Sequence, residues 1–145
     1  MCLRRLCSIS ERQQYAFFAT MSSNKVNLPE DAVVVFDQAS LNVGEAYDET
    51  TGKFTCNVDG LYTFSWTTLS RYKKDLTTVL ITSGTRVVHN VVDTDLTADT
   101  LSSSSTVVVR MRKSEQTWIS VVKGDHLMAL WDSVPSSMFS GFKIN

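Results

Sequence analysis

The chain has 145 residues, an ordinary length for one domain, and its 14 basic and 15 acidic residues leave a net charge of −1. This balance provides no basic field for wrapping nucleic acid or attracting an anionic membrane, so we expect neither partner. The hydrophobic content of 43% suffices for a packed core, yet no apolar segment approaches the roughly 20 residues of a membrane-spanning helix.

The first 14 residues, MCLRRLCSISERQQ, predict a flexible N-terminal extension ahead of a domain at residues 15–145. Arg4 and Arg5 interrupt the stretch that would have to be apolar in a secretory signal peptide, so no standard signal is visible. The three cysteines are an odd number, which argues against a purely intrachain disulfide framework. Cys2 and Cys7 either link chains or remain free thiols, whereas Cys56 is expected to be a small buried residue.

Short strands dominate the rest of the chain. Residues 15–19 are aromatic and apolar, and residues 32–36 are a β-branched run that ends in an aromatic residue. In residues 54–59, and again in residues 62–66, apolar and polar residues alternate with the period of two that is typical of strands. Further strands are predicted at residues 76–81, 86–92, 106–111, 117–122, 126–131 and 138–144.

Turn-forming residues separate these strands. Residues 48–53 and 58–61 carry the Asp and Gly residues of tight turns, and residues 83–84 and 123–125 are expected to form hairpin turns. The serine-rich residues 101–105 are expected to be a polar connection. No window of a dozen residues has convincing helical periodicity, and about ten short strands at regular spacing predict an all-β sandwich or barrel without a second domain.

The stretch from Phe36 to Trp66 reads FDQASLNVGEAYDETTGKFTCNVDGLYTFSW and resembles the signature of the complement C1q-like globular domain. The family usually has Phe or Tyr at the position of Trp66. Residues 15–19, the Gly124-Asp125 pair and residues 139–142 resemble the family's first strand, late hairpin and closing strand, whereas residues 70–115 match only in pattern. The spaced positions that carry the resemblance are Phe36, Asn42, Tyr47, Phe54, Gly60, Tyr62, Phe64 and Trp66.

The resemblance implies a jelly-roll β-sandwich of about ten antiparallel strands that forms compact homotrimers and is secreted. The residues support this fold independently, because five aromatic side chains between Tyr47 and Trp66 can fill the narrow space between two sheets. Gly44 and Gly60 flank strands at points where a residue without a side chain permits a sharp turn. Burial between subunits would also account for the apolar content, which is generous for a small sandwich.

Catalytic motifs are absent from the sequence. His89 lies in a strand-like run and His126 follows the Gly-Asp turn, and neither belongs to a recognisable nucleophile, metal or phosphate motif. We therefore expect a binding protein rather than an enzyme. Zinc is not expected either, because Cys2 and Cys7 have no nearby His or Cys pair that completes a four-ligand set.

Three aspartates, Asp93, Asp95 and Asp99, are the candidate metal ligands, since they cluster in VVDTDLTADT between two strands. A loop with spaced carboxylates and backbone carbonyls supplies the several oxygen ligands that calcium needs. Some C1q-like proteins hold calcium in a comparable connection, so the resemblance makes calcium an optional ligand. The alternative, which we favour, is a solvated acidic loop, and no cofactor is expected to be required.

Two basic clusters are candidate ligand-binding sites. Such clusters capture anionic groups, and a neighbouring tyrosine ring can stack on a sugar. The alternative is ordinary surface charge that protects strand edges from aggregation. The first cluster is the better candidate, since loops at the ends of sandwiches often bind ligands. The clusters are Arg71, Tyr72, Lys73 and Lys74 after the signature strand, and Arg112 and Lys113 at the end of a later strand.

Trp118 and Trp131 are each interpretable as core, subunit interface or exposed ligand platform, with core or interface expected for a large aromatic residue in a strand. Together with the resemblance, these features predict a soluble, trimeric, lectin-like pattern-recognition protein of innate immunity, similar to stand-alone invertebrate defence members. Its ligands would be lipopolysaccharide or acidic glycans on microbial surfaces, bound by three identical copies facing one surface. The alternative is a signalling ligand or structural interaction module that binds a protein receptor.

Overall fold

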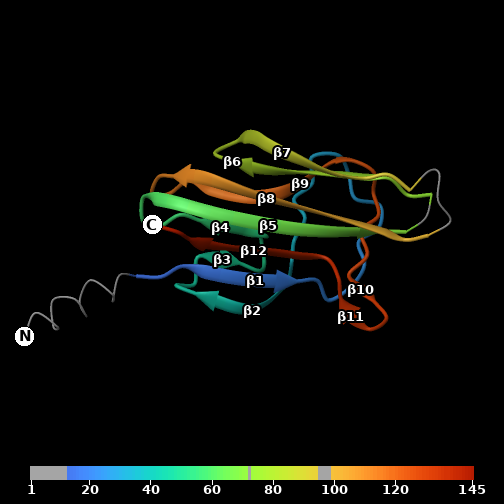
Figure 1. Ribbon diagram of the computed structural model, residues 1–145, viewed down its shortest axis with the longest axis horizontal. Coiled ribbons are helices and arrows are strands. Elements are labelled where there is room, and N and C mark those ends of the chain that lie inside the picture. The colour runs from blue at the N-terminus through green and yellow to red at the C-terminus, as the bar shows by residue number, and fades with distance from the viewer. Residues whose placement is uncertain (1–12, 72, 95–98) are drawn as a thin grey trace, which may run out of the picture.

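The computed structural model describes residues 13–71, 73–94 and 99–145, which form two antiparallel five-stranded sheets and a small hairpin (Figure 1). Sheet I has the strand order β2-β1-β12-β5-β8, and sheet II has the order β3-β4-β9-β6-β7. The described residues contain no helix, and therefore none long and apolar enough to cross a membrane, so the predicted all-β class is confirmed. The strands are β1 (Ala16–Thr20), β2 (Gln38–Val43), β3 (Tyr47–Asp48), β4 (Lys53–Thr55), β5 (Gly60–Ser70), β6 (Leu76–Thr82), β7 (Thr85–Val92), β8 (Leu101–Met111), β9 (Gln116–Lys123), β10 (Leu130–Trp131), β11 (Val134–Pro135) and β12 (Met138–Lys143).

The core lies between the two sheets and is built mainly from aromatic rings. Along β5, Tyr62, Phe64 and Trp66 point inward and are fully buried, while the residues between them are only half-buried and face outward. Phe17 of β1 stacks on Tyr47, with the two ring centroids 4.6 Å apart. These contacts confirm the prediction that the rings concentrated between residues 47 and 66 fill the space between the sheets.

Two buried tyrosine hydroxyls of the core have hydrogen-bond partners. Tyr47 Oη donates to the carbonyl of Phe36 at 2.7 Å, and Tyr62 Oη donates to the carbonyl of Val58 at 2.6 Å. Burial raises the pKa of both tyrosine hydroxyls, so both remain protonated donors at neutral pH. Cys56 is also fully buried, with its Sγ 3.5 Å from Tyr62 Oη, as expected for a small interior residue.

The serine-rich stretch at residues 101–105 is a strand rather than the polar connection expected from its composition. It forms the first half of β8 and pairs with the last residues of β5. Outward-facing hydroxyls bond across the two strands, with Ser65 Oγ 2.8 Å from Thr106 Oγ1 and Thr67 Oγ1 2.6 Å from Ser104 Oγ. Because cross-strand hydroxyl pairs of this kind stabilise a sheet, the polar composition is compatible with a strand.

Two other strand predictions are wrong. Residues 32–36 form only an isolated bridge between Val33 and Ser120, although Val34 is fully buried. Residues 126–131 do not form a hairpin with β9, since Leu127 bridges Lys25 instead and only the last two residues of this range belong to a strand, β10. Local composition does not reveal which distant segment a short apolar run will join, and it also missed β2 and the short strands β3 and β11.

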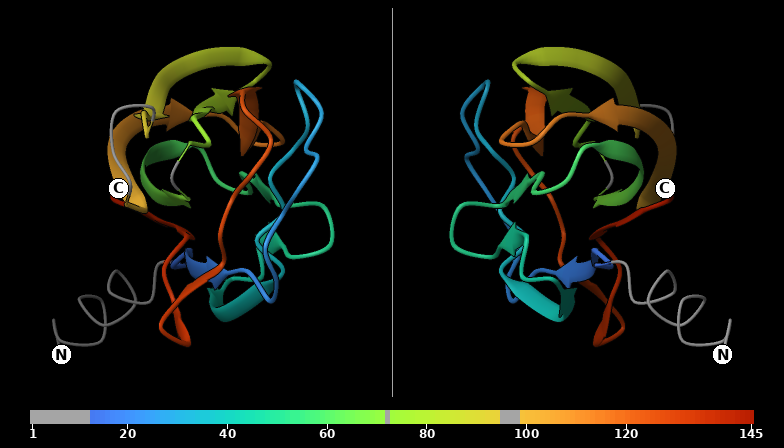
Figure 2. Two further views of the ribbon diagram at one scale, coloured as in Figure 1. Left: turned by 90° about the vertical axis from the view of Figure 1, so that its right-hand side faces the viewer. Right: turned by 90° about the vertical axis from the view of Figure 1, so that its left-hand side faces the viewer.

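The connections gather at two opposite ends of the sandwich, which Figure 2 shows along the strand direction. The 11-residue strands β5 and β8 run between these ends, a span of about 35 Å. The terminus end carries residues 13–15, residues 144–145 and the β8–β9 turn. The loop end carries the β5–β6 and β7–β8 connections, the segment 22–28 and the turn 123–126.

Candidate ligand-binding site

Four segments of the chain converge at the loop end. Gly124 has a φ of 89°, and a Cβ atom built on it would lie 2.0 Å from the carbonyl oxygen of Asp75. Only glycine allows this approach, because any side chain would overlap the backbone of the β5–β6 connection. Directly after the turn, Lys25 and Leu127 exchange backbone hydrogen bonds of 2.8 and 2.9 Å. The turn 123–126 therefore joins the β5–β6 connection to the segment 22–28.

The first predicted basic cluster lies at this end. Arg71, Lys73 and Lys74 are exposed in the β5–β6 connection, whereas Tyr72 lies outside the described residues. The backbone N–H of Lys74 donates to Thr94 Oγ1 at 2.8 Å. This bond joins the β5–β6 connection to the start of the β7–β8 connection. The backbone that carries the basic side chains is therefore fixed in position.

The predicted acidic residues lie beside the basic cluster, although the sequence separates the two. Asp93 and Asp99 are exposed in the β7–β8 connection, and Asp95 lies outside the described residues. Between them, the backbone N–H of Thr94 donates to Asp75 Oδ1 at 2.9 Å. Within the part of the chain that the structure describes, no three His, Cys, Asp or Glu side chains are arranged to hold a metal ion. The described carboxylates therefore do not by themselves form a calcium site, and calcium binding stays a prediction.

A cavity of about 130 Å³ at the loop end brings together three basic side chains from separate segments. Lys25, Arg71 and His126 line it, with Asn24, Val26, Leu127 and Met128. Its size suits one small anionic group, such as a phosphate or a carboxylate, rather than a whole ligand. The sequence identified Arg71 but not Lys25 or His126, because only the pairing of Lys25 with Leu127 brings these segments to Arg71. The only local feature of the sequence that pointed to His126 was the Gly-Asp-His turn.

Asp125 orients the imidazole beside this cavity. Its Oδ1 lies 2.6 Å from His126 Nδ1. This hydrogen bond, assisted by the positive charge of Lys74, holds the pKa of the Asp125 carboxyl below its ordinary value. The carboxylate is therefore ionised at neutral pH and holds the ring by Nδ1, which leaves Nε2 as the other polar atom of the imidazole.

The second predicted basic cluster lies at the opposite, terminus end. The backbone N–H of Lys113 donates to Asp59 Oδ1 at 2.7 Å, and that of Arg112 donates to Glu115 Oε1 at 2.6 Å. These bonds order the β8–β9 turn. Since the 11-residue β5–β8 pair places about 35 Å between this turn and Arg71, the structure does not combine the two predicted clusters into one site.

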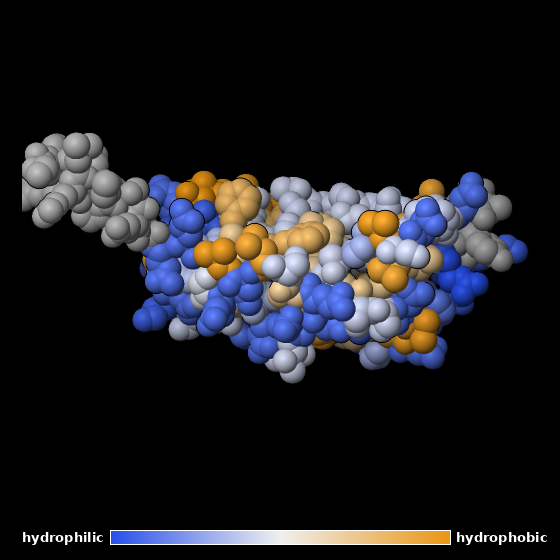
Figure 3. Space-filling view, turned by 90° about the horizontal axis from the view of Figure 1, so that it is seen from below, coloured by the Kyte–Doolittle hydropathy of each residue, from blue (hydrophilic) through white to orange (hydrophobic). Residues whose placement is uncertain are grey.

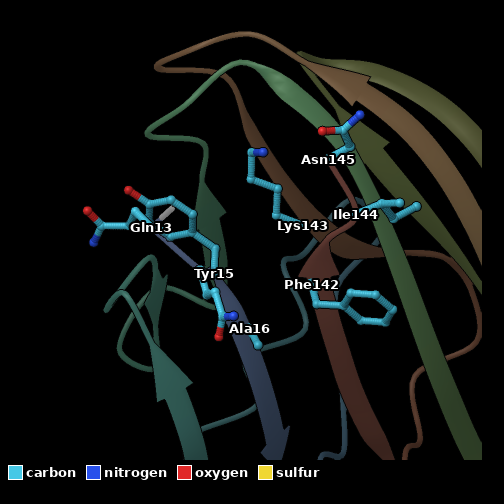
Figure 4. Close-up of a pocket in the computed structure, with 8 residues that line it drawn as sticks. Gln13, Tyr15, Ala16, Phe142, Lys143, Ile144 and Asn145 are labelled. Atoms are coloured by element: carbon cyan, nitrogen blue, oxygen red, sulfur yellow. The ribbon is translucent and has the colours of Figure 1, made fainter. Parts of the chain in front are cut away.

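A larger cavity, of about 430 Å³, lies at the terminus end (Figure 4). Lys143 contributes a basic side chain to its wall, and the backbone N–H of Lys143 donates to the carbonyl of Tyr15 at 2.9 Å. The cavity marks the seam between the first described residues and the end of β12, and it contains none of the predicted site residues. Its full lining is Gln13, Gln14, Tyr15, Ala16, Phe142, Lys143, Ile144 and Asn145.

The two tryptophans of uncertain role occupy different environments. Trp118 on β9 is half-buried, and Lys53 Nζ lies 4.4 Å from the centroid of its ring in a cation–π contact. Trp131 on the β10–β11 hairpin is 57% exposed. Trp131 therefore does not belong to the core of the single chain, because the hairpin stands outside both sheets, and a role at a subunit interface stays a prediction.

The outer face of sheet I is divided into an apolar half and a hydroxyl half. In the apolar half, Phe142 and Val108 are 53% and 58% exposed and belong to one row that crosses all five strands. Toward the loop end the face carries the hydroxyl pairs between β5 and β8. Hydrophobic patches separated by polar residues also appear in the view from the side of β2 (Figure 3). The apolar members of this row are Val43, Ala16, Phe142 and Val108, and the polar Thr63 lies between Phe142 and Val108.

Comparison with known sequences agrees with this architecture. Residues 16–144 match the C1q domain family. Complement C1q tumor necrosis factor-related protein 5 of Rattus norvegicus is 33% identical over 138 residues, which cover 95% of this chain and 56% of that protein. Complement C1q and tumor necrosis factor-related protein 9 of Mus musculus is 28% identical over 115 residues, which cover 79% of this chain and 34% of that protein. The chain thus spans about half the length of the first relative and about a third of the second.

Solved structures share the fold. The globular domain of zebrafish complement 1qA aligns with a TM-score of 0.71 and 21% identity, covering 90% of this chain and 98% of that one. The structure of Eiger TNF from S. frugiperda aligns with a TM-score of 0.71 and 15% identity, covering 92% of this chain and 94% of that one. At these identities the similarity concerns the fold alone, and it confirms the predicted jelly-roll sandwich.

Proposed function

This chain belongs to the C1q domain family, and on that premise we propose that it is a secreted, homotrimeric recognition protein for anionic groups on microbial surfaces, such as those of lipopolysaccharide or acidic glycans. It acts by binding rather than by catalysis. The observation that carries the proposal is the loop-end cavity, where Lys25, Arg71 and His126 meet although they lie far apart in the sequence.

The chemistry of this cavity favours an anion. An Arg guanidinium can bind two oxygens of a phosphate or carboxylate at once, and a Lys ammonium adds a compact positive charge. Lys73 and Lys74 are exposed on the same connection as Arg71 and extend the positive surface beyond the cavity. A ligand with several phosphates or carboxylates therefore gains contacts outside the cavity as well as in it.

Trimer formation is supported by apolar surfaces that a single chain leaves exposed. Phe142 and Val108 lie on the outer face of sheet I, and Val87 and Val91 of the edge strand β7 are 41% and 56% exposed. Exposed apolar surface of this kind marks protein interfaces. A three-fold arrangement points all loop ends in one direction, so that three weak sites act together on one ligand-bearing surface.

The proposal is tested by binding of the protein to immobilised lipopolysaccharide. The double variant R71A/K74A is expected to bind at least about tenfold more weakly than the wild type, because it loses two charge-assisted contacts. The matched control R112A/K113A removes the same charge at the terminus end and is expected to bind like the wild type. Higher salt should weaken wild-type binding, and a chelator should leave it unchanged because no calcium is required.

Several results would contradict this function. If the two double variants lost the same binding affinity, only the net charge of the protein would matter. If a well-folded wild type did not bind, lipopolysaccharide would be excluded as a ligand. A loss of binding in chelator that is reproduced by D93N/D99N would instead assign a calcium requirement to the β7–β8 connection.

The alternative function is a signalling ligand or structural module that binds a protein receptor. The specific observation in its favour is the fold, which the chain shares with Eiger TNF as closely as with a complement 1q domain. A pull-down from cell-surface extracts distinguishes the two functions. Recovery of one receptor-like protein that acidic carbohydrate does not displace would favour signalling.

A further inference from the structure

A second cavity at the loop end differs in character from the one that Lys25 and Arg71 line. It has a volume of about 430 Å³ and is lined by residues from β5, from the start of β8 and from the β10–β11 region. None of the described residues that form its wall is charged. The lining consists of Leu69, Thr100, Ser102, Trp131 and Ser136.

Trp131 belongs to a β-hairpin with a tight turn. Leu130 and Trp131 pair with Val134 and Pro135, and the two residues between them have φ values of 51° and 64°, as in the tight two-residue turns of β-hairpins. Next to the hairpin, Ser137 Oγ accepts a hydrogen bond from the backbone of Leu69 at 3.0 Å. The hairpin thus places Trp131 at the wall of the cavity, with 57% of its surface exposed.

The side chains of this cavity are complementary to a neutral sugar ring. One face of a pyranose carries C–H groups that pack on an aromatic ring, while its edges carry hydroxyls that need hydrogen-bond partners. Trp131 provides the ring, and Thr100, Ser102 and Ser136 provide hydroxyls around it. A phosphate or carboxylate would find no cation among these described residues. The volume of about 430 Å³ falls in the range of small-molecule sites.

We propose that this cavity binds a neutral hexopyranose ring, at a site separate from the anion site at Lys25, Arg71 and His126. The two cavities adjoin one another, because Leu69 lines one, Met128 lines the other, and these two residues form a backbone bridge. The neutral site does not depend on the anion site, although a glycan that spans the two adjoining cavities with a charged group and a neutral sugar would contact both.

The test uses methyl glycosides of glucose, galactose and mannose as probes, with ligand-observed NMR and tryptophan fluorescence as readouts. At least one of these sugars is expected to bind the wild type, and W131A is expected to weaken that binding by about tenfold. W131F keeps a ring and should retain most of the affinity. V134A, on the same hairpin, and R71A, in the other cavity, are the controls and should bind the sugar normally.

Three results would overturn the proposal: no sugar of the set binds a well-folded wild type, W131A binds as well as V134A does, or R71A loses sugar binding together with W131A. Sedimentation of W131A is measured in parallel. A change in its oligomeric state would make Trp131 a subunit contact and would also overturn the proposal. Because the probes carry no charge, failure here is separate from failure of lipopolysaccharide binding.

Discussion

Trp66 illustrates how single residues determine the core of this sandwich. Its indole is fully buried, and Nε1 donates to Thr78 Oγ1 on the facing sheet at 3.0 Å. Thr78 is itself fully buried, so neither group reaches water if the other is removed. The indole is accommodated in the core because β6 supplies a polar partner for its N–H group.

Thr78→Val is expected to lower the free energy of unfolding by about 1–3 kcal/mol, because it leaves the buried indole N–H without an acceptor. Urea denaturation followed by circular dichroism measures this change. The control Thr77→Val alters a half-buried neighbour on the same strand and should have a much smaller effect. The double variant W66F/T78V removes both polar groups and should recover part of the loss; equal effects of the two threonine substitutions would show that the hydrogen bond is unimportant.

Connections between strands determine where the functional groups stand. The turn 123–126 can approach the β5–β6 connection only through Gly124, and this approach places Asp125 and His126 beside Lys74 and Arg71. The turn 123–126, which the sequence predicts as an independent hairpin turn, therefore packs against the β5–β6 connection and forms part of the candidate site.

Gly124→Ala is expected to destabilise the protein by about 1–3 kcal/mol more than Gly84→Ala does. Both glycines have positive φ, 89° and 77°, but a Cβ atom meets the backbone of Asp75 at 2.0 Å in the first case and no described atom within 4 Å in the second. The difference between the two variants thus isolates the steric overlap from the backbone strain.

Thermal and urea denaturation provide the measurement, and binding to lipopolysaccharide provides a second readout. G124A should weaken binding at the loop end while G84A, in the β6–β7 turn, should not. If both variants lose the same stability, the close approach of the turn to Asp75 has no energetic consequence.

At the scale of the whole molecule, the outer face of sheet I carries apolar side chains that a single chain leaves exposed. The apolar row through Phe142 lies near the terminus end, and the hydroxyl half lies near the loop end. Subunit contacts through the apolar half would leave the loop ends free for ligands, consistent with the proposed division between assembly and recognition.

Phe142→Asp is expected to convert a trimer into monomers at micromolar concentration, because it places an unpaired charge in a buried apolar contact. Sedimentation velocity measures the mass. The side chain is 53% exposed in the single chain, so the variant should fold normally. The control Val26→Asp adds the same charge at an exposed position of the loop end and should remain trimeric. A trimeric F142D would place the subunit contact elsewhere.

Much of the fold follows from the sequence by itself. The period-two pattern between residues 54 and 66 assigns Tyr62, Phe64 and Trp66 to the interior, and all three are fully buried. The spacing from Phe36 to Trp66 also identified the family. These inferences succeed because side-chain alternation and turn chemistry are local properties of the chain.

Other features were decided only by the tertiary structure. The serines of β8 form a strand because hydroxyls on β5 face them, and Lys25 joins Arg71 because its backbone pairs with Leu127. Trp131 is exposed because its hairpin stands outside both sheets. Each outcome depends on pairing between segments far apart in the chain, and local pattern carries no information about such pairing. The sequence thus determined the family and the core, while long-range strand pairing placed the residues of the candidate sites.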